Sequence, residues 1–262
     1  MSQETQPNPA TLVRRFARNT AGRDLIVGDV HGCFSKLRAA LASVGFDPAA
    51  GDRLFSVGDL VDRGPECDEV LDWLALPWFF AVRGNHEDMA LRWPNGRMDA
   101  GNYAANGGAW NISNPPALQA EIADACAALP VAIELETATG LVGIVHADCP
   151  FGGWDDLTFA LETPGLSNTR RGSVIDCCLW SRDRITVRNE ASVAGVRAVV
   201  VGHTPVQQPV VLGNVLHIDT GGWLQGGASS REFTILDAAT LALAVKPATQ
   251  PPSPDVKFLH HV

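Results

Sequence analysis

The sequence predicts an α/β fold in which helices cover both faces of a sheet. The chain has 262 residues, of which 46% are hydrophobic and 19% charged, and this composition is typical of a compact protein with one large core. In the first half, apolar runs alternate with amphipathic stretches, and strands follow one another at intervals of about 25 to 30 residues, as in βαβ units. In the second half the apolar runs lie closer together. We therefore expect one domain with two differently built halves.

The first half is predicted to contain three strands and three helices. Short apolar runs predict buried strands over residues 24–29, 53–59 and 78–85. Amphipathic stretches predict helices over residues 33–45, 66–76 and 86–93. In the first of these helices, Phe34, Leu37 and Leu41 share one face. Gly45 then provides a stop signal, and Pro94 ends the third helix.

The second half is predicted to begin with a loop and a helix and to continue with strands. Residues 95–114 are rich in glycine and asparagine and predict a loop, which a helix over residues 115–129 follows. Five apolar runs predict strands over residues 131–136, 141–147, 197–203, 215–221 and 232–238. Residues 148–195 are expected to be a long insertion with one short helical stretch at 174–185.

Both ends of the chain are predicted to lie outside the domain. Residues 1–20 are polar with little periodicity and are expected to be a loose lead-in. Residues 246–262 include a proline-rich run and are expected to be a flexible tail. A single domain is therefore expected over residues 21–245.

Net charge and cysteine content indicate which surfaces the protein is expected not to bind and in which compartment it is expected to work. The formal net charge of −9 argues against a general surface for nucleic acid or anionic membranes. The six cysteines have no CxxC pair and no regular spacing, which indicates reduced thiols of the cytoplasm. No apolar segment follows Arg14-Arg15, and no run of about 18 apolar residues occurs in the sequence. We expect a cytoplasmic monomer that binds neither nucleic acid nor membrane.

Five of the apolar runs end in the same manner, with aspartate, asparagine or histidine, often after a glycine. They read IVGDVHG, SVGDLVDRG, AVRGNHE, GIVHAD and VVVGHT. Ligands of open α/β sheets bind beyond the carboxyl ends of the strands, so these polar residues are expected to meet in one place. They are Asp29, His31, Asp59, Asn85, His86, His146 and His203. Each alone could be a turn residue or a core histidine, but five such ends together point to a common site.

The chemistry of this set indicates a metal centre. Carboxylate, amide and imidazole ligands without thiolate suit Mn²⁺, Fe, Zn²⁺ or Co²⁺. The set holds more ligands than one ion needs, which favours two ions about 3.5–4 Å apart. A carboxylate in the middle of the set can then bridge both.

The five strand ends resemble, in order, the motifs of the calcineurin-like metallophosphoesterases. The motifs are GDVHG (28–32), GDLVDRG (58–64), RGNHE (83–87), VHAD (145–148) and GHTP (202–205). More narrowly, they are similar to the bacteriophage lambda branch of the phosphoprotein phosphatase family, and the likeness extends from about residue 24 to residue 237. The resemblance implies a four-layer α/β/β/α sandwich of two mixed sheets, with the metal site at the carboxyl ends of strands.

The resemblance also implies an activity and a set of metal ligands. The implied ligands are Asp29 and His31 for a first ion, Asp59 as a bridge, and Asn85, His146 and His203 for a second ion. Mn²⁺ is expected at both positions, with Fe or Zn²⁺ as alternatives. A hydroxide between the ions would attack phosphorus directly, which implies a phosphatase of phosphoserine and phosphothreonine in proteins, with phosphotyrosine as a further substrate. Phosphorylated proteins or peptides are thus the expected partners.

The remaining implied roles concern proton transfer and phosphate binding. His86 would protonate the departing serine or threonine oxygen, and Asp62 would orient its imidazole. The implied phosphate clamps are Arg63, Arg83 and Arg182. Arg184 is the less favoured choice in its segment. Three further residues stay open, with Asp148 and Asp219 as candidate partners of ligand histidines and His217 expected in the core.

Two other functions compete with a protein phosphatase. Symmetrical dinucleoside tetraphosphate hydrolases share the GDVHG and GNHE-like blocks, but that family carries alanine in place of Asp62 and leucine in place of Arg83. These two positions favour the phosphatase. A binding module that kept the fold without catalysis would lack a ligand, and no ligand position is missing from this sequence.

Overall fold

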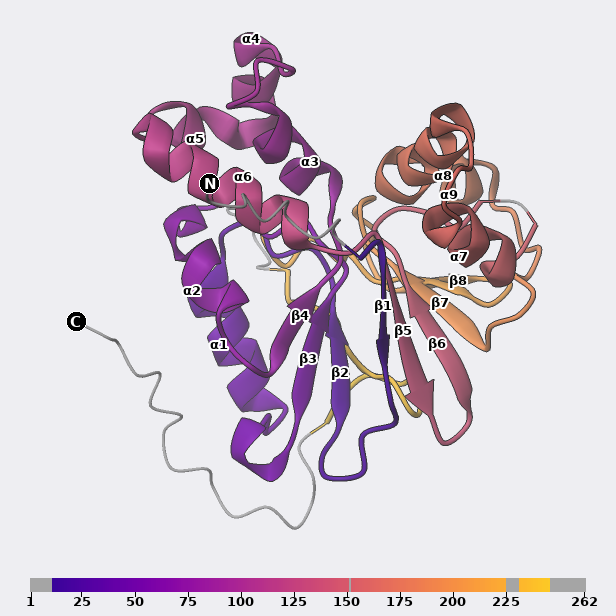
Figure 1. Ribbon diagram of the computed structural model, residues 1–262. Helices are drawn as coiled ribbons and strands as arrows, with labels where there is room; N and C mark the ends of the chain where they lie inside the picture. Colours follow the sequence, from indigo (N-terminus) through magenta and orange to yellow (C-terminus); the bar gives the residue numbers. More distant parts are fainter. Residues whose placement is uncertain (1–10, 151, 225–230, 246–262) are drawn as a thin grey trace, which may run out of the picture.

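The structure is a computed structural model that describes residues 11–150, 152–224 and 231–245. Two mixed sheets pack face to face, and helices cover the outer side of each (Figure 1). Apolar residues from both sheets, among them Ile26 and Ile144, fill the layer between them. The four-layer α/β/β/α sandwich expected from the sequence is therefore confirmed.

The smaller sheet has the strand order β10-β2-β3-β4. The strands are β2 (Asp24–Val27), β3 (Arg53–Ser56), β4 (Phe79–Ala81) and β10 (Ile235–Asp237). β2, β3 and β4 run parallel, and β10 runs antiparallel to β2. Side chains alternate along a strand, so Leu25 and Val27 pack with the helices while Ile26 faces the other sheet. This burial on both faces explains why the strand is apolar throughout.

The larger sheet has the strand order β1-β5-β6-β7-β9-β8. The strands are β1 (Val13–Phe16), β5 (Ala132–Thr137), β6 (Gly140–Ile144), β7 (Ala198–Val201), β8 (Val210–Leu212) and β9 (Val215–His217). β6, β7 and β9 run parallel to one another. Their carboxyl ends therefore reach the same edge of the sheet, where the polar residues follow.

The helices form two groups, one outside each sheet (Figure 1). The group that packs with the smaller sheet is α1 (Phe34–Ser43), α2 (Val70–Leu74), α3 (Asn85–Arg92) and α6 (Pro116–Ala128). The group beside the larger sheet is α7 (Trp154–Glu162), α8 (Asn168–Trp180) and α9 (Asp183–Val187). In the described part of the chain, no helix combines the length and the apolarity that a bilayer crossing requires.

The structure corrects the predicted lead-in over residues 1–20. Val13–Phe16 forms β1, which pairs in parallel with β5 and so belongs to the larger sheet. Val13 is buried, and the ring of Phe16 lies 5.0 Å from that of Phe55. Two arginines between these apolar ends hide the strand in the sequence. Residues 1–10 and the tail predicted over 246–262 lie outside the described residues.

Two segments contain more helix than the sequence predicts. The predicted loop over residues 95–114 holds α4 (Ala100–Tyr103), a π-helical turn (Ala104–Gly108) and α5 (Ala109–Ile112). In the predicted insertion over 148–195, the helical stretch expected at 174–185 is divided between α8 and α9, and α7 is an additional helix. Both segments contain glycine-rich stretches, which is why the sequence predicts irregular structure there. Each nevertheless contains large side chains that the fold buries, such as Tyr103 and Trp154.

Candidate metal centre

Seven polar side chains that follow five strands lie buried together where the two sheets meet the helices. Each is 5% exposed or less. They are Asp29, His31, Asp59, Asn85, His86, His146 and His203. The strands that precede them are β2, β3, β4, β6 and β7. The structure thus brings together all the residues that the sequence predicts as metal ligands, from positions up to 174 residues apart.

Asp59 lies at the middle of this set. Its Oδ2 atom is 3.3 Å from Nε2 of His146, 3.6 Å from Nε2 of His31 and 3.9 Å from Nε2 of His86. Burial raises the pKa of Asp59, but the three histidines outweigh it and hold that pKa well below the ordinary value. Two groups of candidate metal ligands share this carboxylate, one with His31 and the other with His203. Its position is the one that a bridging ligand requires.

The second candidate position is formed by an amide and two imidazoles next to Asp59. Nδ1 of His146 donates to the carbonyl of Val57 at 2.7 Å, so its Nε2 faces the site. That Nε2 lies 2.9 Å from Oδ1 of Asn85 and 3.1 Å from Nδ1 of His203. Burial lowers the pKa of His146, but the Asp59 carboxylate outweighs it and raises that pKa. The oxygen and nitrogen donors of these side chains fit a divalent ion.

The first candidate position is the group of His31, Asp59 and His86, and Asp29 is buried close to Asp59. Nδ1 of His31 donates to the carbonyl of Val61 at 2.8 Å, which aims its Nε2 at the site. Burial raises the pKa of Asp29 well above its ordinary value, and the neighbouring Asp219 and Asp59 raise it further. Several carboxylates in one buried place repel each other unless a cation lies among them. This donor set therefore also fits a divalent ion.

The backbone of the site adopts conformations that are rare for residues other than glycine. Seven described residues other than glycine have a positive φ, and five of them belong to the site. Those five are His31 (45°), Asp59 (50°), Asp62 (68°), Arg63 (68°) and His203 (65°). Each conformation costs on the order of 1–3 kcal/mol, and such strain is concentrated where function needs a fixed geometry. Other contacts must hold these turns in place.

Glu87, in the first turn of α3, supplies part of that support. The sequence did not single it out. Its Oε2 accepts hydrogen bonds from the N–H groups of Asp59 (2.8 Å) and Gly84 (2.7 Å). Its Oε1 accepts from the N–H groups of Leu60 (2.7 Å) and Val61 (3.3 Å). The carboxylate is fully buried, so it ties the turn after β3 to the turn before α3.

Replacing Glu87 by glutamine is expected to destabilise the fold by about 3 kcal/mol, because a buried amide would turn its own N–H groups toward two backbone donors. Denaturant unfolding measures the loss. The matched control is Glu136→Gln, which changes an exposed residue of β5 and is expected to alter stability by less than about 0.5 kcal/mol. Equal stability of the two variants would contradict the supporting role of Glu87.

The predicted acid and its partner form a close pair. Nδ1 of His86 lies 2.7 Å from Oδ2 of Asp62, and both side chains are buried. The ring of His86 also meets that of His31 edge-on, with centroids 4.6 Å apart. The other carboxylate oxygen, Oδ1 of Asp62, accepts a hydrogen bond of 2.7 Å from Nε1 of Trp110. The sequence interpretation missed Trp110, because it treated the surrounding segment as a loop.

Of the three predicted phosphate clamps, Arg63 lies within the cluster. Its Nη1 is 2.8 Å from Nε2 of His31, and its guanidinium stacks 4.7 Å from the ring of Trp223. Trp223 in turn lies 4.5 Å from the ring of His31 and was not predicted as a site residue. The arginine can therefore reach a phosphate beside the first candidate position.

The other two arginines lie differently. The guanidinium of Arg83 does not join the cluster, because its Nη2 donates to the carbonyls of Ala127 and Leu129 at the end of α6. This arrangement satisfies the end of a helix, where a cation is favourable. Burial lowers the pKa of His203 to about 3, and the exposed Arg182 adds to that shift, whereas Arg184 is buried and paired with Asp148. The choice of Arg182 over Arg184 as a phosphate clamp stays a prediction.

The three residues left open by the sequence do not orient ligand histidines. Asp148 binds Nε of Arg184 at 2.9 Å. Asp219 accepts hydrogen bonds from Gly221 N and from Nε1 of Trp223, and lies against Asp29. His217 is buried in β9, and burial lowers its pKa to about 4. Carbonyl groups of Val57 and Val61 instead orient His146 and His31, a role that the sequence cannot show.

Comparison of the whole sequence with known proteins gives matches among phosphoesterases and phosphatases. Residues 23–207 match the model of the calcineurin-like phosphoesterases. The chain is 35% identical over 221 residues to serine/threonine-protein phosphatase 1 of Salmonella typhimurium, which covers 83% of this chain and 95% of that protein. It is 34% identical over 210 residues to phosphatase 2 of the same species, covering 78% and 89%. A symmetrical bis(5'-nucleosyl)-tetraphosphatase of Serratia proteamaculans is 47% identical over 64 residues, which cover 24% of this chain and 22% of that protein.

Solved structures share the fold at low identity. A putative diadenosine tetraphosphatase superposes with a TM-score of 0.56 at 20% identity, and the match covers 88% of this chain and 95% of that one. A cold-active protein tyrosine phosphatase superposes with a TM-score of 0.52 at 17% identity, covering 86% and 75%. At these identities the likeness concerns the arrangement of sheets and helices alone.

Proposed function

Since this chain belongs to the calcineurin-like phosphoesterase family, we propose that it is a metal-dependent phosphatase of phosphoserine and phosphothreonine in proteins. The observation that carries the proposal is the pair formed by Asp62 and His86 beside two ligand groups that share Asp59. A serine or threonine alkoxide is a poor leaving group, so its hydrolysis needs a proton donor at this place. The two Salmonella phosphatases, which match most of this chain, support the same substrate class.

We propose that two divalent ions, with Mn²⁺ expected first, bind at the candidate positions. Asp29 and His31 would hold one ion, and Asp59 would touch both. The ligands proposed for the other ion are Asn85, His146 and His203. When bound, such ions polarise a phosphoryl oxygen and lower the pKa of water toward neutrality.

The side chains of the protein supply the rest of the chemistry. The Asp62 carboxylate holds Nδ1 of His86, which leaves Nε2 to carry a proton to the departing oxygen. Arg63 and Arg182 would bind the phosphate oxygens and orient the phosphorus for attack. For Arg83 we propose a structural role at the end of α6, in place of the clamp expected from the sequence.

Hydrolysis of symmetrical dinucleoside tetraphosphates is the second candidate function. The tetraphosphatase of Serratia proteamaculans has the higher identity, but only over 64 residues. That match covers 24% of this chain, whereas the two Salmonella phosphatases match 78% and 83% of it. Asp62, which pairs with His86 here, favours the protein phosphatase.

A substrate panel distinguishes the two functions. Protein stripped with a chelator and reloaded with Mn²⁺ is expected to hydrolyse phosphoserine and phosphothreonine peptides with a kcat/KM at least about tenfold above that for diadenosine tetraphosphate, because the acid His86 serves an alkoxide leaving group. Asn85→Ala, purified in the same way, is the control for contaminating phosphatases. Faster turnover of the tetraphosphate, or turnover that Asn85→Ala retains, would contradict the proposal.

A further inference from the structure

The indole of Trp110 reaches the pair of Asp62 and His86 directly. Its Nε1 donates to Oδ1 of Asp62 at 2.7 Å, while Oδ2 of the same carboxylate binds Nδ1 of His86 at 2.7 Å. Asp62 is fully buried, so each of its oxygens depends on a partner within the protein. Trp110, Asp62 and His86 therefore form a chain of two short hydrogen bonds that come from three separate segments.

The segment around Trp110 is shaped to press against the turn that carries Asp62. Gly107 has φ 100°, and a Cβ there would lie 2.6 Å from the backbone nitrogen of Arg63. A Cβ on Gly108 would lie 2.2 Å from the ring of Tyr103. Both positions are thus closed to any larger residue. The close approach brings the start of α5 against the turn after β3.

The other side of α5 is anchored in the core. Asn111 is fully buried and donates through Nδ2 to the hydroxyl of Tyr103 at 3.2 Å. Tyr103 is itself fully buried. Trp110, which precedes Asn111, is partly buried and packs against the same core. Its indole therefore has a fixed place, from which a single N–H group points at the carboxylate.

We propose that Trp110 is a positioning residue for proton transfer by His86, a role that rests on the function proposed above. A carboxylate held at one oxygen can rotate about its Cβ–Cγ bond, and the imidazole that it orients would then swing with it. A second hydrogen bond at Oδ1 removes that rotation. Nε2 of His86 then stays aimed at the leaving oxygen, and a misplacement of about 1 Å at such a group can cost about 10²-fold in rate.

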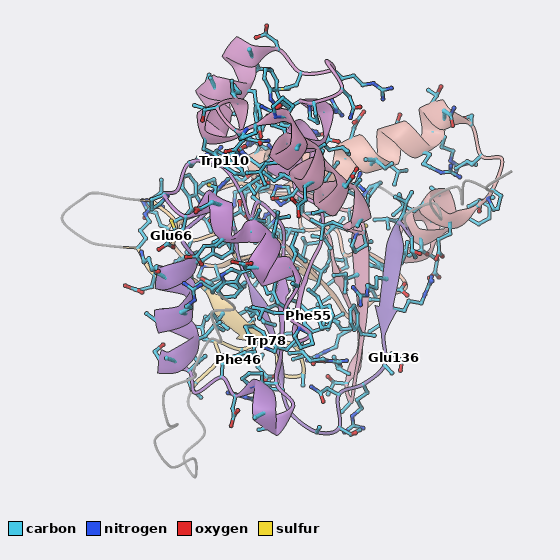
Figure 2. The ribbon with its side chains drawn as sticks, turned by 60° about the vertical axis from the view of Figure 1, so that its left-hand side comes forward. Phe46, Phe55, Glu66, Trp78, Trp110 and Glu136 are labelled. Carbon is cyan, nitrogen blue, oxygen red and sulfur yellow. The ribbon has the colours of Figure 1, made fainter. Side chains whose placement is uncertain are left out.

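The test compares Trp110→Phe with Trp78→Phe. The two tryptophans are both partly buried, but Trp78 lies near Phe46 in the lower part of the molecule, whereas Trp110 lies in the upper part (Figure 2). Trp110→Phe is expected to lower kcat on a phosphoserine peptide by about 10- to 100-fold, and on p-nitrophenyl phosphate by less than about 3-fold, because nitrophenolate hardly needs a proton. KM and bound metal are expected to stay unchanged. Trp78→Phe is expected to leave the ratio of the two rates as in the wild type.

A second replacement keeps the shape of the side chain. Benzothienylalanine at position 110 has sulfur in place of the indole N–H, so it removes the donor alone. It is expected to reproduce the split between the two substrates. In the double variant with Asp62→Asn, the losses are expected to be far from additive, because both changes break the same chain of hydrogen bonds.

One readout does not depend on activity. In the ¹⁵N-labelled protein, the indole N–H of Trp110 is expected to resonate far downfield and to exchange slowly with solvent, and Asp62→Asn is expected to shift it. If the wild type hydrolysed no phosphomonoester, the proposed function would fail while this resonance still tested the contact. Equal losses on both substrates, an unchanged rate with benzothienylalanine, or an indole resonance insensitive to Asp62→Asn would each overturn the role proposed for Trp110.

Discussion

Replacing His86 by asparagine is expected to lower kcat on a phosphoserine peptide by about 10²- to 10⁴-fold, which is the range that a general acid contributes. The geometry supports this size, because Nδ1 of His86 is bound to Asp62 and its Nε2 is 3.9 Å from the shared carboxylate of Asp59. On p-nitrophenyl phosphate the loss is expected to be below about tenfold, because that leaving group departs without a proton. Bound metal, measured by elemental analysis, is expected to remain as in the wild type.

His217→Asn is the matched control for this experiment. It changes another buried histidine, which lies in β9 and is not among the candidate ligands. Its effect on the two substrates is expected to be equal. If His86→Asn also slowed both substrates by the same factor, or if it released the metal, His86 would act as a ligand or a structural residue and not as the acid.

Replacing Asp59 by asparagine is expected to weaken the binding of both ions by at least tenfold each. An amide can offer its oxygen to one ion only, whereas the Oδ2 atom of Asp59 lies within 3.6 Å of ligand nitrogens from both candidate positions. The replacement also removes a carboxylate at the centre of the site whose pKa the neighbouring histidines hold low. Calorimetric titration of the stripped protein with Mn²⁺ measures both affinities.

Thermal unfolding gives a second measure of the same change. Mn²⁺ at about 100 times its Kd is expected to stabilise the wild type by about 2.7 kcal/mol per site, and most of this gain is expected to vanish in Asp59→Asn. The control is Asp24→Asn, which removes a buried carboxylate at the opposite end of β2, where it pairs with Arg53. Unchanged metal affinity in Asp59→Asn would remove the bridging role.

The sequence predicts which polar residues lie together because each of them follows closely on an apolar strand. Because β2, β3 and β7 are buried, the polar residues that follow them lie at the edge of the sheet. Their positions in the sequence, just after an apolar run, are then enough to identify them. The two-sheet arrangement came from the family resemblance. Periodicity alone showed strands but could not show which sheet each one joins.

The supporting residues could not be predicted in the same way. Glu87 accepts hydrogen bonds from residues 26 to 28 positions earlier, and Trp110 reaches Asp62 across 48 positions. The pattern of neighbouring residues in the sequence predicts neither contact, because each contact depends on how two distant segments pack against each other. The position of Arg83, two residues before Asn85, likewise does not give the direction of its side chain, whose Nη2 donates to carbonyl groups at the end of α6.

The most direct test of the metal centre is anomalous diffraction at the manganese edge from crystals grown with Mn²⁺. The account predicts two peaks about 3.5–4 Å apart, with Asp59 in contact with both. One peak is expected to touch Asp29 and His31, and the other Asn85, His146 and His203. A single peak, or a pair of peaks that Asp59 does not join, would contradict it.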